Sequence, residues 1–168
     1  MKFGLYLIYG LTWALSRLPM RVLYALSDCL FPLIYHIARY RRKLVRRQLQ
    51  ECFPQQPAQW RRQVERKFYH FFCDYIVETL KLMHMGSREI ERRVTWDGLE
   101  ELQAEMRTRG KKFAVAYLGH YGNWEWVASF SSHLAPDFGG AQIYHPLKNK
   151  RVDRFFLKLR RQFGGDCI

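Results

Sequence analysis

One stretch, from Val115 to Trp126, constrains the fold more than any other part of the chain. It begins as a short apolar run, continues as Gly-His-Tyr-Gly-Asn, and ends in an aromatic-rich segment. This order predicts a buried strand, a tight loop and the first turn of a helix. Asn123 is a suitable N-cap, which makes Glu125 the second helical residue. Open α/β sheets carry their chemistry at such loops, so His120 is the first candidate for a reactive group.

His120 and Glu125 together resemble the general-base part of a catalytic triad, in which a carboxylate orients an imidazole that removes a proton from a hydroxyl. The sequence has no Gly-x-Ser-x-Gly motif to supply an enzyme nucleophile. The hydroxyl can instead belong to a substrate, and the reaction is then a direct acyl transfer to an alcohol. The alternative is an ordinary hydrogen-bonded His–Glu pair without catalysis.

The chain is strongly basic, with 28 Lys and Arg against 15 Asp and Glu and a formal net charge of +13. This charge favours anionic lipid surfaces, phosphorylated lipids or nucleic acid as partners, without choosing among them. No recognised nucleic-acid motif accompanies it. The four cysteines are widely spaced, which indicates reduced thiols and no zinc site.

The N-terminal third alternates apolar and basic segments. Residues 3–16 carry no charge, residues 22–38 form a second apolar run broken at Asp28 and Pro32, and residues 39–47 are rich in arginine. Residues 3–16 are shorter than the roughly 20 residues of a comfortable bilayer span. Together the segments predict an anchor at the membrane interface with a juxtamembrane basic patch. A buried core helix and a solvated basic helix face are the alternatives.

The remaining chain predicts an α/β fold. Residues 59–85 carry a wide apolar stripe at helical spacing, and this helix is expected to pack its aromatic side chains into the core. Further helices are expected at residues 98–109, 124–134 and 149–163. Strands are expected at residues 92–96, 112–118 and 141–144, with another beginning at 166–168. The predicted fold class is a helical, membrane-associated N-terminal region (residues 1–50) followed by a partial, partly parallel sheet with flanking helices (residues 51–168).

Several ordered motifs resemble one known family. Gly-His-Tyr-Gly-Asn-Trp-Glu-Trp is similar to the HX4(D/E) motif of the bacterial lipid A biosynthesis acyltransferases, within the lysophospholipid acyltransferase superfamily. The basic segment at 40–43 with Phe53-Pro54, and the block at 144–149 followed by Asp153 and Arg160, also resemble this family. Family members run to roughly twice this length, so the resemblance also implies a fragment or a truncated chain.

The resemblance implies roles for individual residues. His120 and Glu125 would be catalytic, and no metal or organic cofactor is implied. Arg160 would contact a phosphate or the phosphopantetheine of a carrier, and Asn123, Asn149 and Asp153 are further candidate substrate-binding residues. Helix capping explains Asn149 and Asp153 equally well.

The resemblance also implies partners and a location. An acyl carrier protein, or acyl-CoA, would donate a fatty acyl chain to a hydroxyl of a lipid A precursor or related glycolipid. The enzyme would work at the cytoplasmic face of the bacterial inner membrane, with no nucleic acid as partner. The alternative is a membrane-bound remnant of the family that keeps the His–Glu pair without a competent donor pocket.

Overall fold

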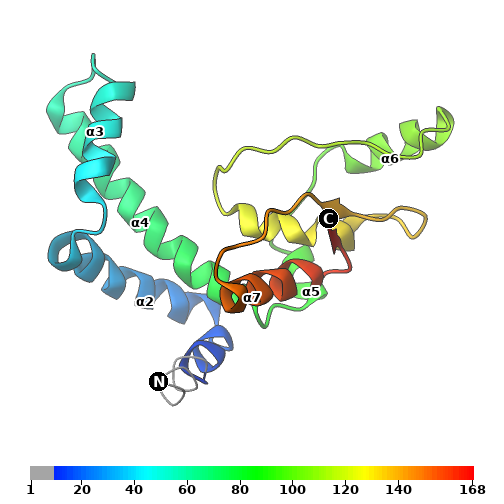
Figure 1. The fold of residues 1–168 in the computed structure, drawn as a ribbon, viewed down its shortest axis with the longest axis horizontal. Coiled ribbons are helices and arrows are strands. Elements are labelled where there is room, and N and C mark those ends of the chain that lie inside the picture. The colour runs from blue at the N-terminus through cyan, green and yellow to red at the C-terminus, as the bar shows by residue number, and fades with distance from the viewer. Residues whose placement is uncertain (1–9) are drawn as a thin grey trace. The chain divides into compact units, whose positions relative to one another are not determined.

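The computed structural model describes residues 10–168, which form two compact units (Figure 1). The first unit ends at Lys81 and the second begins at Leu82. The predicted division after residue 50 stays a prediction. Part of the apolar segment predicted at residues 3–16 lies outside the described residues.

The first unit is helical. Residues 10–16 form one helix, and it is followed by α2 (Met20–Pro32), the π-helix η1 (Leu33–Ala38), α3 (Arg42–Cys52) and most of α4 (Ala58–Leu82). The interruption expected at Pro32 is confirmed, because α2 ends there and the chain continues as a π-helix. Proline has no N–H for the helical ladder, and π-helical turns occur where that ladder is disturbed. Within the described residues, no helix has both the length and the apolar character needed to cross a membrane.

The helix predicted at residues 59–85 is confirmed as α4, but its buried stripe differs from the predicted one. Buried residues recur every fourth position, at Glu65, Tyr69, Cys73 and Val77. Several predicted core aromatics instead face outward, and Phe68 is 41% exposed. The prediction that every aromatic side chain of this helix packs into the core was therefore wrong for Phe68 and Phe71. The apolar stripe is wide, so the sequence did not determine which helix face turns inward.

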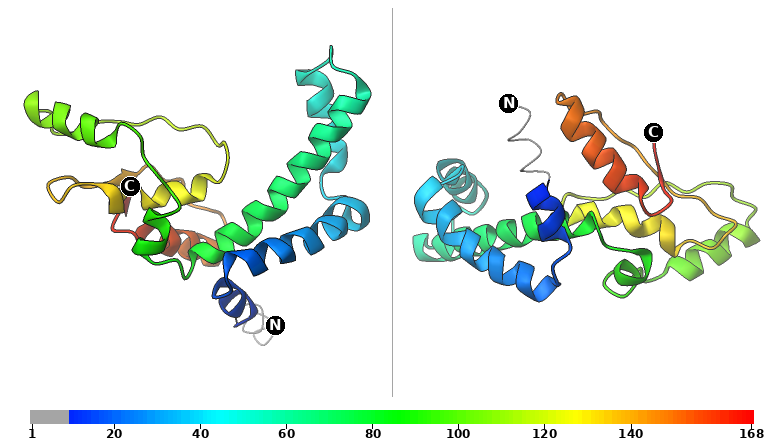
Figure 2. Two further views of the ribbon diagram at one scale, coloured as in Figure 1. Left: turned by 180° about the vertical axis from the view of Figure 1, so that it is seen from behind. Right: turned by 90° about the horizontal axis from the view of Figure 1, so that it is seen from below.

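α2 lies along α4 in both ribbon views of this unit (Figures 1 and 2). The Ser27 hydroxyl donates to Asp74 at 2.6 Å, and the Tyr24 hydroxyl donates to Glu78 at 2.9 Å. An apolar cluster lies further along the pair of helices and comprises Phe31, Tyr35, Tyr69 and Cys73. These contacts fix the face of α4 that turns inward.

The second unit contains helices and a small sheet. Its elements are α5 (Ser87–Glu91), α6 (Leu99–Thr108), the 3-10 helix η2 (Trp124–His133), β1 (Ala141–Gln142), α7 (Lys150–Arg161) and β2 (Asp166–Cys167). β1 and β2 are parallel, with Ala141 opposite Asp166. The predicted partly parallel sheet is thus present as one β-α-β unit.

Two predicted strands are absent from the described residues. Residues 92–96 form a turn and an irregular segment after α5, and residues 112–118 form an extended loop without a strand partner (Figures 1 and 2). Phe113 is 82% exposed and Tyr117 is 94% exposed. The apolar pattern predicted these strands, but a strand forms only where a neighbour satisfies its backbone groups.

Candidate active site

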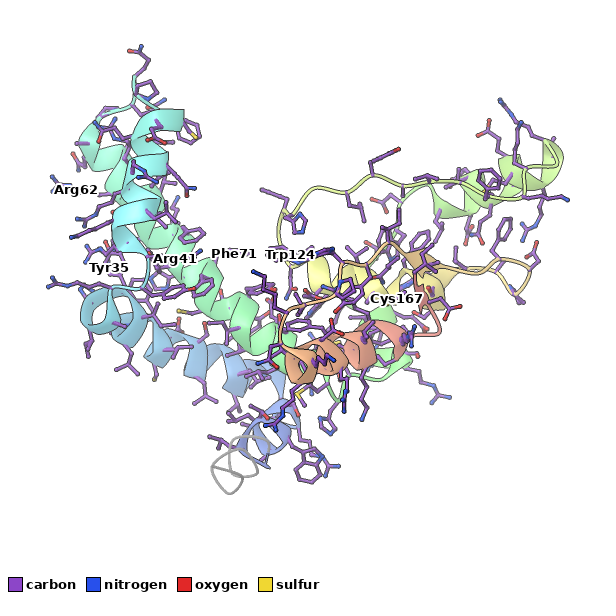
Figure 3. The ribbon with its side chains drawn as sticks, viewed as in Figure 1. Tyr35, Arg41, Arg62, Phe71, Trp124 and Cys167 are labelled. Carbon is purple, nitrogen blue, oxygen red and sulfur yellow. The ribbon has the colours of Figure 1, made fainter. Side chains whose placement is uncertain are left out.

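His120 lies in the loop that joins the extended segment to η2. Its side chain is exposed, and its ring meets the edge of Trp124 at a centroid distance of 5.1 Å. Trp124 is labelled in Figure 3, where it lies at the start of η2. Gly122 has a φ of 63°, a left-handed conformation that a side chain makes costly. The tight loop expected here is therefore present, and it leaves the imidazole open to solvent.

Glu125 is the second residue of η2, as predicted, and only 4% of it is exposed. Its carboxylate binds Arg160, which comes from α7. The guanidinium donates from Nη2 to Oε1 at 2.9 Å and from Nε to Oε2 at 3.2 Å. Among the described residues, this bidentate pair takes the place of the predicted His120–Glu125 hydrogen bond. Each carboxylate oxygen keeps a second lone pair that can accept another donor.

Arg160 is held on several sides. Its guanidinium carbon lies 5.2 Å from the ring centre of Tyr144 and 5.6 Å from that of Phe156. Burial alone lowers the pKa of Arg160. The hydrogen bond and the charge of Glu125 raise this pKa by more than burial lowers it, so the net pKa is above the ordinary value. Arg160 therefore stays charged and fixes the position of Glu125.

Asn149 and Asp153 connect the end of β1 with α7. Asn149 caps α7, and its side-chain oxygen accepts from the amides of Arg151 at 3.0 Å and Val152 at 3.4 Å. Asp153 accepts from the Tyr144 hydroxyl and from an amide at the end of the preceding loop. These two hydrogen bonds, the one from Tyr144 first, hold the pKa of Asp153 below its ordinary value. The capping interpretation accounts for Asn149, whereas Asp153, in the first turn of α7, fixes the loop before the helix. The contact of both residues with substrate stays a prediction.

Asn123 precedes η2 as the predicted cap, but its side chain makes no capping hydrogen bond. It lines a cavity of about 380 Å³ together with Arg93, Trp96 and Trp126. Within the described part of the chain, the indole N–H groups of Trp96 and Trp126 are buried without a hydrogen-bond partner. Buried donors of this kind normally have a partner, so they can donate to an oxygen of a bound molecule.

Sequence reasoning did not find this cavity, because its wall combines segments that are about thirty residues apart. The two tryptophans were the available signal, since indole N–H groups in buried positions need acceptors. Among the described residues, no group of three His, Cys, Asp or Glu side chains could hold a metal ion.

A histidine and a carboxylate in one motif, with no protein nucleophile beside them, are typical of enzymes that transfer a group directly between two substrates. A family model of bacterial lipid A biosynthesis acyltransferases matches residues 1–168. The chain belongs to this family. The family membership predicted from the His120–Glu125 motif and the other resembling segments is therefore confirmed.

A curated relative supports the same assignment. The chain is 27% identical over 145 residues to the lipid A biosynthesis lauroyltransferase of Escherichia coli K12. The alignment covers 86% of this chain and 45% of that protein, so the chain spans about half the length of its relative. No solved structure matches the chain significantly. Membership of this family supports an acyltransferase in general terms.

Proposed function

We propose that the chain transfers a fatty acyl group from the thioester of an acyl carrier to a hydroxyl of a lipid A precursor or related glycolipid. The observation that carries the proposal is the exposed His120 in the family motif, whose Glu125 is held in place by Arg160. Acyl carrier protein is the proposed donor, with acyl-CoA as the alternative. No cofactor is needed for this reaction.

The proposed chemistry begins with proton removal. The His120 imidazole accepts the proton of the acceptor hydroxyl while its oxygen attacks the thioester carbonyl. The tetrahedral intermediate places a negative charge on the former carbonyl oxygen, and backbone N–H groups around Gly122 are candidate donors to it. Collapse of the intermediate breaks the C–S bond, and the leaving thiolate takes the proton from the imidazolium. Glu125, anchored by Arg160, is proposed to orient the loop that carries His120.

The charge of +13 supports two further parts of the proposal. It favours attraction to anionic headgroups on the cytoplasmic face of the inner membrane, where a lipid acceptor lies. It also favours encounter with an acidic carrier protein. The exposed apolar side chains of α2 and η1, among them Leu33 and Ile37, fit contact with the membrane interface.

The test is transfer of a labelled acyl group from acyl carrier protein to a lipid A precursor, in membranes that contain the 168-residue chain. We expect His120→Ala to reduce transfer by about 10²- to 10⁴-fold, because that range is typical of losing a general base. Glu125→Ala should also reduce transfer. His36→Ala is the matched control, since His36 is also exposed but lies in η1, outside the segments that resemble the family, and it should retain activity.

Two results would count against this form of the proposal. Equal activity of the His120→Ala and His36→Ala variants would remove His120 from the chemistry. No transfer by this chain, with transfer restored when the second half of a longer relative is fused to it, would favour the catalytically incomplete remnant instead.

A further inference from the structure

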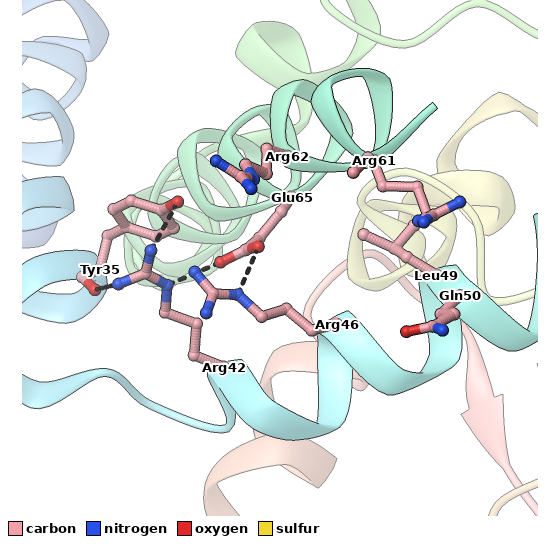
Figure 4. A pocket seen from close by; sticks show the side chains of 9 residues that line it. Tyr35, Arg42, Arg46, Leu49, Gln50, Arg61, Arg62 and Glu65 are labelled. Atoms are coloured by element: carbon pink, nitrogen blue, oxygen red, sulfur yellow. Dashed lines mark hydrogen bonds and ion pairs between the residues drawn. The ribbon is translucent and has the colours of Figure 1, made fainter. Parts of the chain in front are cut away.

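A second polar site lies in the first unit, away from the residues of the His120 motif in sequence. It is a pocket of about 510 Å³ between α3 and α4. Four arginines line it: Arg42 and Arg46 come from α3, and Arg61 and Arg62 come from α4. Figure 4 shows Arg42 and Arg46 bound to the carboxylate of Glu65, and Arg61 further along the pocket beside Leu49 and Gln50.

Glu65 is a buried charge that organises two of the arginines. It is 1% exposed, and its two oxygens accept from Arg42 Nε at 2.6 Å and from Arg46 Nε at 2.8 Å. Burial alone raises the pKa of Glu65, but the hydrogen bonds from Arg46 and Arg42 lower it more, so the net pKa is below the ordinary value. The carboxylate is therefore ionised and fully engaged with two guanidinium groups.

The arginines differ in how many donors they have left. Arg42 is the most engaged, because its terminal amino groups also donate to the backbone oxygen and the hydroxyl of Tyr35. Arg46 donates to Glu65 through Nε alone, and it also interacts with the Tyr35 side chain, so part of its terminal amino donors stays available for a ligand.

The α4 arginines also have donors to spare. Arg61 is fixed through Nη1, which donates to backbone oxygens of the loop before α4, among them that of Phe53 at 3.2 Å. Arg62 has no partner within the described part of the chain. Four guanidinium groups against one carboxylate leave three uncompensated positive charges at this pocket.

Free guanidinium donors on opposite walls of one pocket suit a tetrahedral anion. Arginine binds phosphate through two parallel N–H donors, and a guanidinium already held by its Nε loses little freedom on binding. Arg46 is held in this way by Glu65, and Arg61 is held by the loop. The pocket is large enough for a phosphate with an attached headgroup.

The neighbouring surface favours a phosphate at a lipid surface over a free phosphate ion. Ile37 is 74% exposed and Tyr40 is 51% exposed, and both lie a few residues before Arg42. The chain turns sharply here, since Arg39 and Arg41 both have positive φ. Exposed apolar side chains therefore precede the basic pocket in sequence by two to five residues, as in segments that insert at a membrane interface.

We propose that the pocket between α3 and α4 binds the phosphate of an anionic phospholipid, with Arg46 and Arg62 as the contacting side chains. Glu65 acts as a positioning residue that holds Arg46 in its binding orientation. This inference does not depend on acyl transfer, because it concerns a different set of residues in the first unit.

The test compares binding of the full chain to phosphatidylcholine vesicles with and without phosphatidylglycerol. The ratio of the two affinities is the readout, because apolar contacts contribute to both. Arg62→Gln and Arg46→Gln are the pocket variants. Arg66→Gln on α4 and Arg47→Gln on α3 are the controls. Both substitutions remove the same charge from the same helices, and both arginines are exposed and do not line the pocket.

We expect each pocket variant to lower the ratio at least about five-fold more than its control, which corresponds to about 1 kcal/mol of phosphate contact. Arg62→Gln breaks no contact inside the described chain, so it tests the site without affecting the fold. Equal losses in pocket and control variants would overturn the proposal in favour of a diffuse charge effect. A final comparison is displacement of the chain from phosphatidylglycerol vesicles by millimolar inorganic phosphate and by added anionic vesicles. Equally effective displacement by the two would overturn the lipid as the source of the bound phosphate.

Discussion

Arg160 is the residue that gives Glu125 a defined position. A carboxylate that is 4% exposed has lost most of its hydration, and the two hydrogen bonds from Arg160 replace it. A buried ion pair of this kind contributes little compared with an apolar pair, yet breaking it on one side is costly. Arg160 is thus a positioning residue in the described structure, and its predicted contact with a phosphate stays a prediction.

Removing one member of this pair should destabilise the protein. We expect Arg160→Met to lower the free energy of unfolding by about 3–5 kcal/mol, because Glu125 is then buried without a partner. The double variant Glu125→Leu/Arg160→Met should recover much of that loss. Chemical denaturation of wild type, both single variants and the double variant measures the coupling. Additive losses would show that the two side chains act independently.

The sequence predicted the loop around His120 but not the partner of Glu125. The two glycines, Asn123 and the aromatic start of η2 are local signals, and the structure has a left-handed Gly122 and a helix beginning at Trp124. The Glu125–Arg160 pair joins residues 35 positions apart. Its geometry depends on how α7 packs against η2, and no local pattern encodes that packing.

At the scale of elements, α7 is the best defined by its own sequence. Asn149 caps its N-terminus, and its last turn carries Lys158, Arg160 and Arg161, which suit the negative end of a helix. The predicted helix at residues 149–163 is therefore confirmed as Lys150–Arg161. The helices at residues 59–85 and 98–109 were predicted by the same kinds of local signal and are also confirmed.

The strands were less predictable than the helices. The hydrogen bonds of a helix lie within one segment, whereas a strand needs a neighbour. β1 finds β2, and the amide of Ile168 donates to the oxygen of Gln142 at 3.0 Å. Residues 112–118 have the composition of a strand but no partner among the described residues. The sequence pattern alone does not show whether a strand-like segment has a neighbouring strand to pair with.

Substitutions at Asn149 distinguish its role as the cap of α7 from its predicted role in contacting substrate. We expect Asn149→Ala to lower the free energy of unfolding by about 1 kcal/mol, because two amides lose their acceptor. Asn149→Ser should keep most of the stability, since serine is also a good cap. Thermal and denaturant unfolding of both variants provides the measurement. If Asn149→Ser folds normally but loses acyl transfer, Asn149 contacts substrate as well.

For the whole molecule, the two compact units divide the proposed tasks between different residues. The first unit contains the arginine pocket, and the second contains His120, Glu125 and Arg160. Its composition indicated the basic character of the chain, but not that three uncompensated charges meet at one pocket. That convergence depends on the turn at Arg39–Arg41, which directs α3 back along α4. The net charge therefore predicted attraction to anionic partners, and only the fold showed that the charges gather at the pocket between α3 and α4.

The buried carboxylate of this pocket makes the stability of the whole chain depend on pH. The pKa of Glu65 is lower in the folded protein than its ordinary value of 4.5. The ionised form is therefore favoured by folding, and its stabilisation is complete above that ordinary value. It is lost as the pH falls through the lowered pKa, because the carboxylate is then protonated and its pairs with Arg42 and Arg46 weaken.

We expect Glu65→Gln to be less stable than wild type at pH 7, and we expect the difference between their melting temperatures to narrow as the pH falls from about 5 to about 3. Circular dichroism melts across this range measure the difference. Glu51→Gln is the matched control, because Glu51 is an exposed partner of Arg47 on α3 and its loss should leave the pH profile parallel to that of wild type. A constant difference between Glu65→Gln and wild type at every pH would contradict the prediction. Other carboxylates would then be responsible for the acid sensitivity, and Glu65 would contribute only its packing and neutral hydrogen bonds to the pairing of α3 with α4.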